Sequence, residues 1–468
     1  MKFSKHRQVV CVQGLGYVGS AMAVAIASAK NKDRSPLYNV IGLDLNDKQG
    51  QDKVDRLNNQ IFPYESKDEK LLSEFKKIFM EDNFFATTDD SKIAQADIII
   101  CDVNLDVIKK NRVDDVNLNH LKKAIISIAN NMKKNSLIII ETTVPPGTCE
   151  NYIIPILNEH LSKRGFDEGS YYLAHSFERV MPGKDYLSSI SNFWRVYAGK
   201  CKKSAKKCRD FFSSLINTKD YPLTELSSMR ASELTKVMEN SYRAVNIAFI
   251  DEWTKFANEI NINLAESIEA IKVRPTHSNI MSPGFGVGGY CLTKDPLLAN
   301  IGARNFYSLP DMNFPFSEMS IKINNKMPSN SINMIKNVIG NFENKSICVL
   351  GASYREDIAD TRYSPSVKFI KEVLKLGSYI TVYDPLVKNL YDLDIKLVNK
   401  IPENEDFDLI VITVKHEEFN KIDFKKWLRN SKPFVFDANY VLTDKQIKDI
   451  KFLGCKFNGI GRSIRESE

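Results

Sequence analysis

The first third of the chain alternates between apolar runs and amphipathic segments. Residues 8–29, QVVCVQGLGYVGSAMAVAIASA, begin as an apolar strand, pass through a glycine-rich turn and continue as a helix of small residues. Residues 38–46, YNVIGLDLN, predict a second strand, and ADIIICDV at 96–103 and NSLIIIETTV at 135–144 are further β-branched runs on either side of the helical segment 118–134. Continuous apolar strands that alternate with helices predict a parallel sheet covered on both faces.

The last third repeats this pattern. Strand-like runs occur in KSICVLGASY, YITVYDP, FDLIVITV and KPFVFDA, and SPSVKFIKEVLKLG, residues 364–377, predicts a helix. Such a segment predicts a second doubly wound domain. Between the two ends, roughly residues 225–275 have helical periodicity and contain no internal glycine or proline. We therefore predict an α/β protein in which a long central helix joins two doubly wound, Rossmann-like domains.

Composition narrows the class of protein. At 468 residues the chain is too long for one hydrophobic core, and its 43% hydrophobic and 26% charged residues are typical of globular proteins. The net charge of +7 is spread over many lysines, which indicates a mild preference for anionic ligands, and we expect no nucleic-acid partner. The first residues lack the apolar length of a signal peptide, and no run reaches about 18 apolar residues. We expect a cytoplasmic protein with no membrane span.

One of the eight cysteines has unusual surroundings. The cysteines form no CxxC pair, so we expect neither a disulfide framework nor a metal site. Cys291 follows a run of glycines in PGFGVGGYCLTKDP, residues 283–296, and glycines allow another group to approach the main chain closely. A thiol there is either a nucleophile or a small apolar filler, and spacing alone leaves both interpretations open.

The sequence GLGYVG predicts a cofactor site. Gly14, Gly16 and Gly19 follow a strand and begin a helix, where they allow a tight turn, close approach of a pyrophosphate and close helix–strand packing. Asp44 closes the next strand, and its carboxylate would accept hydrogen bonds from ribose hydroxyls and repel a 2′-phosphate, which favours NAD over NADP. We assign the intervening Tyr17 and Val18 to the same site. The alternatives are a glycine turn without a ligand and an ordinary aspartate at a strand end.

The central helix carries a polar stripe. Lys236, Asn240 and Arg243 fall at i, i+4 and i+7, on one face. Glu233 stands one turn before Lys236, which allows the two side chains to pair. A second, apolar face carries Leu234, Met238 and Val245. The polar stripe is either a solvated surface or a set of directed hydrogen-bonding groups.

Five ordered motifs resemble those of the nucleotide-sugar 6-dehydrogenases, the UDP-glucose/GDP-mannose dehydrogenase family. They are GLGYVG, ETTVPPGT, SELTKVMENSYRAVNIAFIDE, PGFGVGGYCLTKDP and GASYREDIADTRYSPS, and the resemblance covers residues 9 to 460. It implies NAD-dependent, four-electron oxidation of a UDP-sugar at C6 to the uronic acid, which provides polysaccharide precursors. In this family a cysteine captures the aldehyde as a thiohemiacetal, and a thioester is then hydrolysed.

The resemblance also implies roles for single residues. Cys291 matches the nucleophile, and Lys236 and Asn240 match the pair that holds the developing oxyanion. Asp295 matches the aspartate near the hydrolytic water, Thr143 a threonine that positions this water beside the cofactor, and Glu178 the proposed general base. Lys236 would also raise the thiolate fraction of the cysteine, which is only ~3% for an unperturbed thiol at pH 7. The alternatives are a buried inert thiol, a surface carboxylate at 178 and a loop-capping hydroxyl at 143.

Further residues are assigned to the ligands. In the family the C-terminal domain holds UDP, and GASYREDIADTRYSP follows a strand, at the edge where such sheets bind ligands. Arginine suits a diphosphate because it donates paired hydrogen bonds. The substrate residues that we assign are Arg243, Arg274, Gly288, Tyr354, Arg355 and Arg362, with Asp360 beside them; Lys294 joins the cofactor set. Family members often present an arginine near 274 to the substrate of a neighbouring subunit, and Arg362 is alternatively a structural ion-pair residue.

Several positions depart from the family pattern. Leu105 and Asp106 replace the usual threonine and proline of a turn near the cofactor, Phe177 replaces a proline, and Tyr290 replaces a histidine or serine. Arg355 stands where lysine is usual. ERVMPG resembles members that act on UDP-N-acetylhexosamines, whereas Lys294 is more typical of UDP-glucose enzymes. The sugar therefore stays open among the UDP-hexoses, the UDP-N-acetylhexosamines and GDP-mannose.

We predict three domains: an NAD-binding Rossmann domain at 1–215, a central helical domain with the cysteine loop at 216–325 and a UDP-sugar-binding domain at 326–468. The central helix is expected to form a homodimer or a higher oligomer. Two other functions stay open: a two-electron β-hydroxyacid-type NAD dehydrogenase and a non-catalytic nucleotide-binding sensor.

Overall fold

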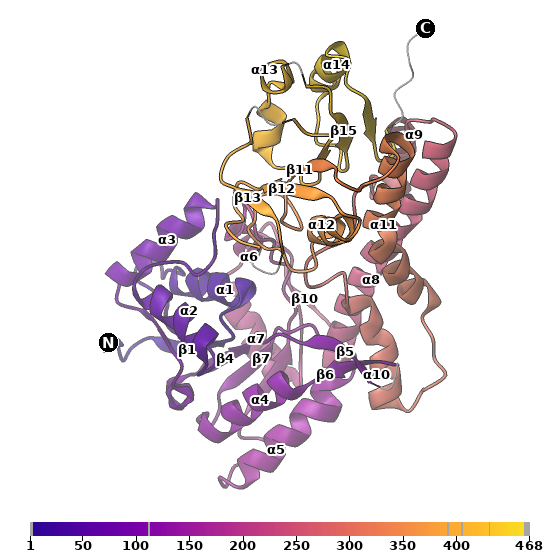
Figure 1. Ribbon diagram of the computed structural model, residues 1–468. Coiled ribbons are helices and arrows are strands. Elements are labelled where there is room, and N and C mark those ends of the chain that lie inside the picture. Colours follow the sequence, from indigo (N-terminus) through magenta and orange to yellow (C-terminus); the bar gives the residue numbers. More distant parts are fainter. Residues whose placement is uncertain (1–2, 111–112, 391–392, 404–405, 430, 463–468) are drawn as a thin grey trace. The chain divides into compact units, whose positions relative to one another are not determined.

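The computed structural model describes residues 3–110, 113–390, 393–403, 406–429 and 431–462, and these form two compact units. Unit 1 comprises Met1–Glu239 and Leu297–Asn313, and unit 2 comprises Asn240–Pro296 and Phe314–Glu468. Helix α8, Met229–Glu259, is continuous over 31 residues and contributes to both (Figure 1). The predicted fold class, two doubly wound domains with a long central helix, is confirmed.

Unit 1 is built on an eight-stranded sheet with the strand order β10-β9-β8-β7-β4-β1-β2-β3. All neighbouring strands are parallel except β8 and β9. The strands are β1 Gln8–Gln13, β2 Tyr38–Leu43, β3 Phe84–Thr87, β4 Ile98–Cys101, β7 Leu137–Ile140, β8 Tyr172–His175, β9 Val196–Gly199 and β10 Thr224–Glu225. The order β3-β2-β1-β4-β7-β8 is the doubly wound arrangement of dinucleotide-binding sheets.

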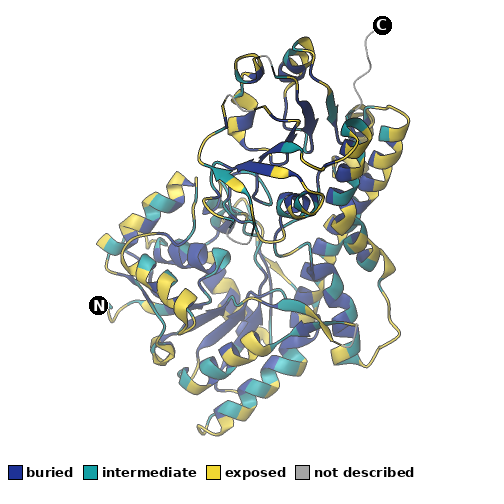
Figure 2. Ribbon diagram, viewed as in Figure 1, coloured by how far each residue is buried: buried dark blue, intermediate teal, exposed yellow. Residues whose placement is uncertain are grey.

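Besides part of α8, unit 1 contains eight α-helices in the described part of the chain. They are α1 Tyr17–Ala27, α2 Lys48–Asn58, α3 Glu69–Met80, α4 Asn119–Asn131, α5 Ile154–Ser162, α6 Ser188–Ser191, α7 Lys202–Ser213 and α10 Leu298–Tyr307. Strands β1, β2, β4 and β7 are buried almost throughout (Figure 2), which explains their β-branched composition. An antiparallel hairpin, β5 Asp106–Lys110 with β6 Val113–Asn117, follows β4. Leu105 and Asp106, which depart from the family pattern, stand at its start.

Unit 2 repeats the arrangement with a six-stranded parallel sheet in the order β13-β12-β11-β14-β15-β16. Its strands are β11 Ser346–Leu350, β12 Tyr379–Tyr383, β13 Lys396–Val398, β14 Leu409–Ile412, β15 Phe434–Asp437 and β16 Phe457–Gly459. Its helices, besides part of α8, are α9 Leu264–Lys272, α11 Pro315–Ile339, α12 Pro365–Lys375, α13 Phe424–Leu428 and α14 Asp444–Phe452. Phe285, two residues after Pro283, packs into the core of this sheet against Phe369.

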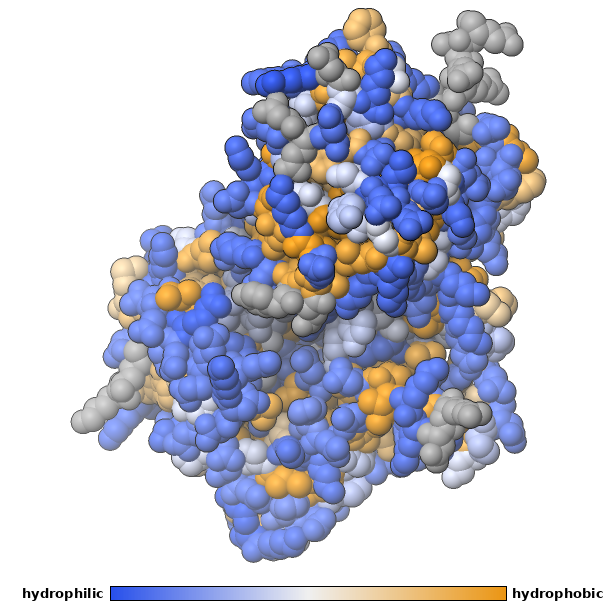
Figure 3. Space-filling model, in the orientation of Figure 1, coloured by the Kyte–Doolittle hydropathy of each residue, from blue (hydrophilic) through white to orange (hydrophobic). Residues whose placement is uncertain are grey.

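The surface is mainly polar on the face drawn in Figure 3, where hydrophilic side chains surround small apolar areas. Among the described residues, no helix combines the length and the apolar character that crossing a bilayer requires.

Candidate active site

The glycine-rich turn of unit 1 has the geometry of a pyrophosphate site. A Cβ on Gly14, where φ is +101°, would lie 2.2 Å from the carbonyl oxygen of Asp102, and a Cβ on Gly19 would lie 1.9 Å from that of Gly14. A Cβ on Gly16 would meet nothing within 4 Å. The first and third glycines are therefore required by packing, whereas the main chain at Gly16 is open to a ligand. Tyr17 and Val18 begin α1 directly after it.

Asp44 lies beside this turn, directly after β2. Its carboxylate accepts hydrogen bonds from the backbone N–H groups of Leu15, at 3.1 Å, and Leu45, at 2.7 Å. It also forms an ion pair with Lys53 of α2. The structure thus brings the predicted ribose-binding acid to the glycine turn, and Lys53 is a neighbour that sequence reasoning missed.

Buried charges gather where β4, β7 and β8 end. Glu141 follows β7 and forms an ion pair with Arg195, and both side chains are almost fully buried. Burial raises the pKa of Glu141 to about 7 despite the guanidinium. The pKa of Asp102, directly after β4, is raised well above its usual value, first by burial and then by Glu141 and Glu178. The carboxylate of Glu178 accepts the N–H of Val180.

The start of α8 fixes Lys236. Its ammonium donates a 2.8 Å hydrogen bond to the carbonyl oxygen of Glu178 and lies 5.4 Å from the ring centroid of Phe177. Lys236 and Asn240 are buried, whereas Leu234 and Met238 are exposed. The interpretation of the stripe as a solvated surface is therefore wrong at 236 and 240.

Glu233 does not pair with Lys236, which corrects the expectation from their helical spacing. Its carboxylate instead accepts the backbone N–H groups of Gly147, at 2.6 Å, and Cys149, at 2.8 Å. These residues belong to the loop that carries Thr143, so Glu233 ties α8 to that loop. Burial raises the pKa of Glu233 to about 7.

In unit 2, Cys291 begins a tight turn. Its carbonyl oxygen accepts the backbone N–H groups of Lys294, at 3.1 Å, and Asp295, at 2.9 Å. The fully buried carboxylate of Asp295 accepts from the side-chain amide of Asn240 at 2.7 Å and from the ammonium of Lys294 at 2.6 Å. The structure thus brings three predicted residues, Asn240, Lys294 and Asp295, into one network.

Cys291 is exposed, as is Cys201, whereas the other six cysteines are buried and none of the eight takes part in a disulfide. The inert-filler interpretation requires a buried thiol and therefore does not fit Cys291. Cys201 directly precedes α7, and the hydroxyl of Ser204 lowers the pKa of its thiol. Any experiment on thiol reactivity has to separate these two cysteines.

The glycines before Cys291 accommodate protein side chains. A Cβ on Gly288 would lie 2.6 Å from the Cβ of Tyr354, and a Cβ on Gly289 would lie 2.7 Å from the ring of Tyr354. Burial, followed by Asp360, raises the pKa of Tyr354 to about 12, so its hydroxyl stays protonated at neutral pH. The glycines therefore let Tyr354 approach the cysteine loop. This packing is enough to explain why the two positions are glycine, and no bound ligand is needed for that explanation. The assignment of Gly288 to the substrate stays a prediction.

The remaining predicted arginines of unit 2 have different surroundings. The guanidinium of Arg362 pairs with both carboxylate oxygens of Asp360 and lies 5.5 Å from the ring centroid of Tyr290. Arg355 donates to Glu356 at 3.3 Å. Arg243 and Arg274 are exposed. The structural ion pair considered for Arg362 is present. Its assignment to the substrate stays a prediction.

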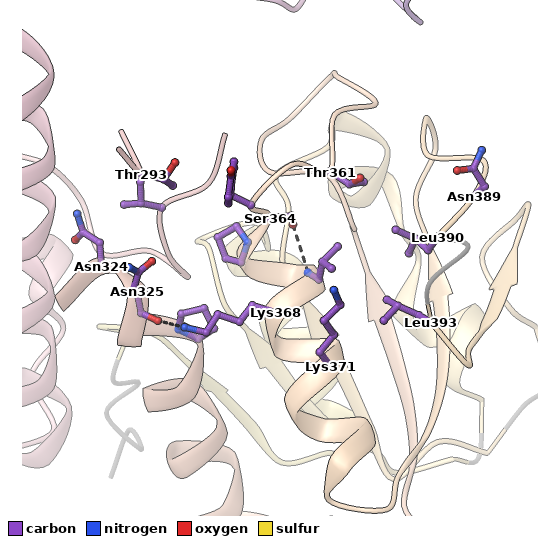
Figure 4. A pocket seen from close by; sticks show the side chains of 15 residues that line it. Thr293, Asn324, Asn325, Thr361, Ser364, Lys368, Lys371, Asn389, Leu390 and Leu393 are labelled. Carbon is purple, nitrogen blue, oxygen red and sulfur yellow. Dashed lines mark hydrogen bonds between the residues drawn. The ribbon is translucent and has the colours of Figure 1, made fainter. Parts of the chain in front are cut away.

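Unit 2 also contains a cavity of about 690 Å³ that sequence reasoning did not identify. The loop between β11 and α12, the first turns of α12 and one side of α11 line it (Figure 4). Lys368 and Lys371 are its charged lining residues, and Pro328, Leu390 and Leu393 provide apolar surface. No acidic residue lines the cavity in the described part of the chain, so its chemistry suits an anionic organic molecule.

Three segments of the chain match models of known protein domains. The NAD binding domain of the UDP-glucose/GDP-mannose dehydrogenase family matches residues 8–216, its central domain matches 230–326, and its UDP binding domain matches 348–444.

Individual proteins resemble nearly the whole chain. A UDP-N-acetyl-D-mannosamine dehydrogenase of Methanocaldococcus jannaschii is 32% identical over 416 residues, which cover 88% of this chain and 87% of the relative. A UDP-glucose 6-dehydrogenase of Rickettsia conorii is 28% identical over 96% of this chain and 99% of the relative. Among solved structures, a UDP-D-ManNAc dehydrogenase from Pyrococcus horikoshii has a TM-score of 0.81 at 27% identity and covers 97% of this chain and 100% of its own.

Proposed function

Because the chain belongs to the UDP-glucose/GDP-mannose dehydrogenase family, we propose that it oxidises C6 of a UDP-hexose or UDP-N-acetylhexosamine to the carboxylate, with NAD as the electron acceptor. NAD as cofactor and the expected resemblance are confirmed by the family comparison. The observation that carries the proposal is the buried network of Asn240, Lys294 and Asp295, which holds the turn that begins at the exposed Cys291.

The stoichiometry of the proposed reaction defines what the residues have to do. One alcohol, two NAD⁺ and one water give one carboxylate, two NADH and three protons. NAD supplies the hydride acceptor in both oxidation rounds. The protein has to hold the aldehyde between the rounds, deliver a water to the acyl group and accept protons.

We assign the covalent role to Cys291. Its thiolate would add to the C6 aldehyde and form a carbon–sulfur bond, so that the aldehyde cannot escape before the second hydride leaves C6. Hydrolysis of the resulting thioester breaks this bond and returns the thiol. Lys236 and Asn240 are assigned to the oxyanion that forms when sulfur or water adds to the carbonyl carbon.

The assignment of the water site concerns Asp295, Glu178 and Thr143. Asp295 is fully buried, and its hydrogen bonds to Asn240 and Lys294 keep its carboxylate in one orientation. Glu178 follows the end of β8 by three residues. Its main-chain carbonyl oxygen accepts a hydrogen bond from Lys236 and so orients the ammonium group. Glu178 is therefore the general base of the proposal, with Thr143 as a hydroxyl partner for the water.

The identity of the sugar is proposed from the relatives. A UDP-N-acetyl-D-mannosamine dehydrogenase and a UDP-glucose 6-dehydrogenase both align with nearly the whole chain, and the former is more similar in sequence. We therefore propose a UDP-N-acetylhexosamine as the preferred substrate. A panel of UDP-glucose, UDP-GlcNAc, UDP-GalNAc, UDP-ManNAc and GDP-mannose, compared by kcat/KM, tests this choice.

Counting the NADH formed per sugar consumed tests the reaction class. Two NADH per sugar support the four-electron oxidation. One NADH, with an aldehyde or ketone as product, would support the two-electron dehydrogenase instead, and none would support a nucleotide-binding sensor.

Replacement of Cys291 by serine tests the covalent step. The Cys291→Ser variant should form no more than trace uronic acid while it still binds NAD and UDP-sugar. Cys201→Ser is the matched control, because it removes the other exposed thiol and should leave the rate unchanged. Undiminished uronic acid formation by Cys291→Ser would refute the assignment.

A further inference from the structure

The ends of three neighbouring strands place a carboxyl group beside the glycine turn. Gln13 of β1 is in register with Cys101 of β4, and Cys101 is in register with Ile140 of β7. The next residues along these strands, Gly14, Asp102 and Glu141, therefore lie side by side at the carboxyl edge of the sheet. The N–H of Asp102 donates to the carbonyl oxygen of Gln13, and that of Glu141 donates to Cys101.

The side chain of Asp102 reaches the first turn of α1. A Cβ on Gly19 would lie 3.3 Å from the Oδ2 atom of Asp102, so the absence of a side chain at Gly19 gives the carboxyl group its place. The N-cap of α1, Gly16, has no capping side chain, and the first turn of α1 contains no acidic residue. The carboxyl group of Asp102 thus lies at the positive end of this helix.

Other charges around Asp102 are mainly negative. Glu141 after β7 and Glu178 after β8 both raise the pKa of Asp102, whereas the charge of Arg195, before β9, and a hydrogen bond from the backbone N–H of Gly19 lower it. Arg195 is already paired with Glu141. Cys101 of β4 and Tyr186 also interact with Asp102, and burial raises the pKa of both. Burial thus favours the protonated form of Asp102, and the two glutamates add to this preference.

We propose that NAD binding is coupled to proton uptake by Asp102, because the carboxylate and the NAD pyrophosphate compete for the same end of α1. A dinucleotide pyrophosphate carries two negative charges and binds at the N-terminus of the first helix in this type of fold. Its arrival makes an ionised Asp102 less favourable. By thermodynamic linkage, a proton on Asp102 then strengthens NAD binding to the same extent that NAD strengthens proton binding.

The sign of the effect follows directly. NAD affinity should be greatest where Asp102 is protonated in the free protein and should decrease as pH rises, by up to about tenfold per pH unit for one linked proton. The inference requires only the NAD site and not the identity of the sugar, so that it fails or holds independently of the proposed oxidation.

Calorimetry on the unaltered protein tests the inference first. NAD is titrated into the enzyme without UDP-sugar at several pH values between 5 and 9, in buffers of different ionisation enthalpy. The dependence of the observed binding enthalpy on the buffer gives the number of protons exchanged. Uptake of a fraction of a proton is expected, and zero uptake or proton release across this range would overturn the proposal.

An isosteric variant assigns the proton to its residue. Asp102→Asn keeps the shape of the side chain and cannot ionise, so it should bind NAD with less pH dependence than the parent. Asp210→Asn, an exposed carboxylate on α7 paired with Lys206, is the control and should keep the parental slope. A parental pH slope in Asp102→Asn would overturn the assignment, and if this variant does not fold, the calorimetry still decides.

Discussion

Glu233 joins two elements of unit 1 through hydrogen bonds to backbone amides. Both carboxylate oxygens are used, one by Gly147 and one by Cys149, and the side chain is fully buried. Glu233 precedes Lys236 by less than one helical turn, and the loop that it holds follows Thr143 by four residues. We infer that Glu233 is a positioning residue that fixes Lys236 relative to Thr143 without contacting the substrate.

Replacement of Glu233 by glutamine is expected to reduce kcat about 10- to 100-fold while KM for NAD changes by less than about threefold. The amide offers one acceptor oxygen and turns an NH₂ group toward the second backbone N–H, which leaves a buried donor unsatisfied at a cost of about 1–3 kcal/mol. Steady-state kinetics measure both constants. Glu252→Gln, an exposed position on the same helix, is the control. Equal increases of KM for both ligands with kcat unchanged would contradict a positioning role.

The pKa of Glu233 predicts how stability depends on pH. Because burial raises this pKa from about 4.5 to about 7, the folded state holds the proton more tightly than the unfolded state. The resulting stabilisation is fully present below about pH 4.5 and is lost as pH rises through about 7. The difference in unfolding free energy between the parent and Glu233→Gln should therefore widen from pH 8 to pH 5. Urea unfolding at several pH values measures this difference, and a constant difference would contradict the shift.

Single residues also show how far sequence reasoning reached. Gly14, Gly19 and Asp44 were predicted because the motif fixes their places on a strand, a turn and a helix. The partners of Glu233 were not predicted, because backbone amides of a distant loop leave no signal in side-chain spacing. Helical spacing favours a pair between Glu233 and Lys236, but such spacing describes pairs on an exposed helix surface. Glu233 is buried, so the rule does not apply to it.

At the scale of elements, the strands that are buried on both faces were predicted well. Their continuous β-branched runs differ clearly from amphipathic helices. The β5–β6 hairpin was not predicted, because DVIKKNRVDDVN is polar and charged and lacks an apolar face. The departure from the family pattern at Leu105 and Asp106 lies at the start of this hairpin.

Two alanine substitutions in the β1–α1 turn should separate folding from cofactor binding. Gly16→Ala has space for its Cβ and should fold with a nearly unchanged melting temperature, yet bind NAD at least tenfold more weakly because the methyl group meets the pyrophosphate. Gly19→Ala would bring its Cβ against the carbonyl of Gly14 and should lower both stability and NAD affinity. Thermal melts and NAD titrations measure these effects. Unchanged NAD binding by a folded Gly16→Ala would place the pyrophosphate elsewhere.

At the scale of the whole molecule, neither compact unit is one continuous segment of the chain. Helix α10, Leu298–Tyr307, belongs to unit 1 although residues on both sides of it belong to unit 2. Arg304 of α10 donates a 2.6 Å hydrogen bond to the carbonyl oxygen of Asp114, and Asn305 bonds to Asp115 at 2.9 Å. These contacts to the β5–β6 hairpin could not be predicted, since the hairpin itself was not. The predicted boundaries at 215 and 325 stay a prediction.

The part of α8 in unit 2 carries an exposed aromatic stripe. Tyr242, Phe249, Trp253 and Phe256 follow one another at intervals of seven, four and three residues, which places them on one helix face. Each is about half exposed, and Trp253 makes edge-to-face ring contacts with both Phe249 and Phe256. A contiguous aromatic surface of this kind typically marks a protein interface.

We predict that this stripe joins two copies of the chain, as expected for the central helix. Trp253→Glu places a charge in the middle of the stripe, which costs most where water is excluded. The parent should sediment at twice 53.3 kDa or more, and the variant at 53.3 kDa. Phe452→Glu, which makes the same kind of change at an exposed aromatic on α14, should keep the parental mass. If Trp253→Glu keeps the parental mass as well, the copies associate through another surface, and if the parent is monomeric at micromolar concentration, the stripe has a different partner.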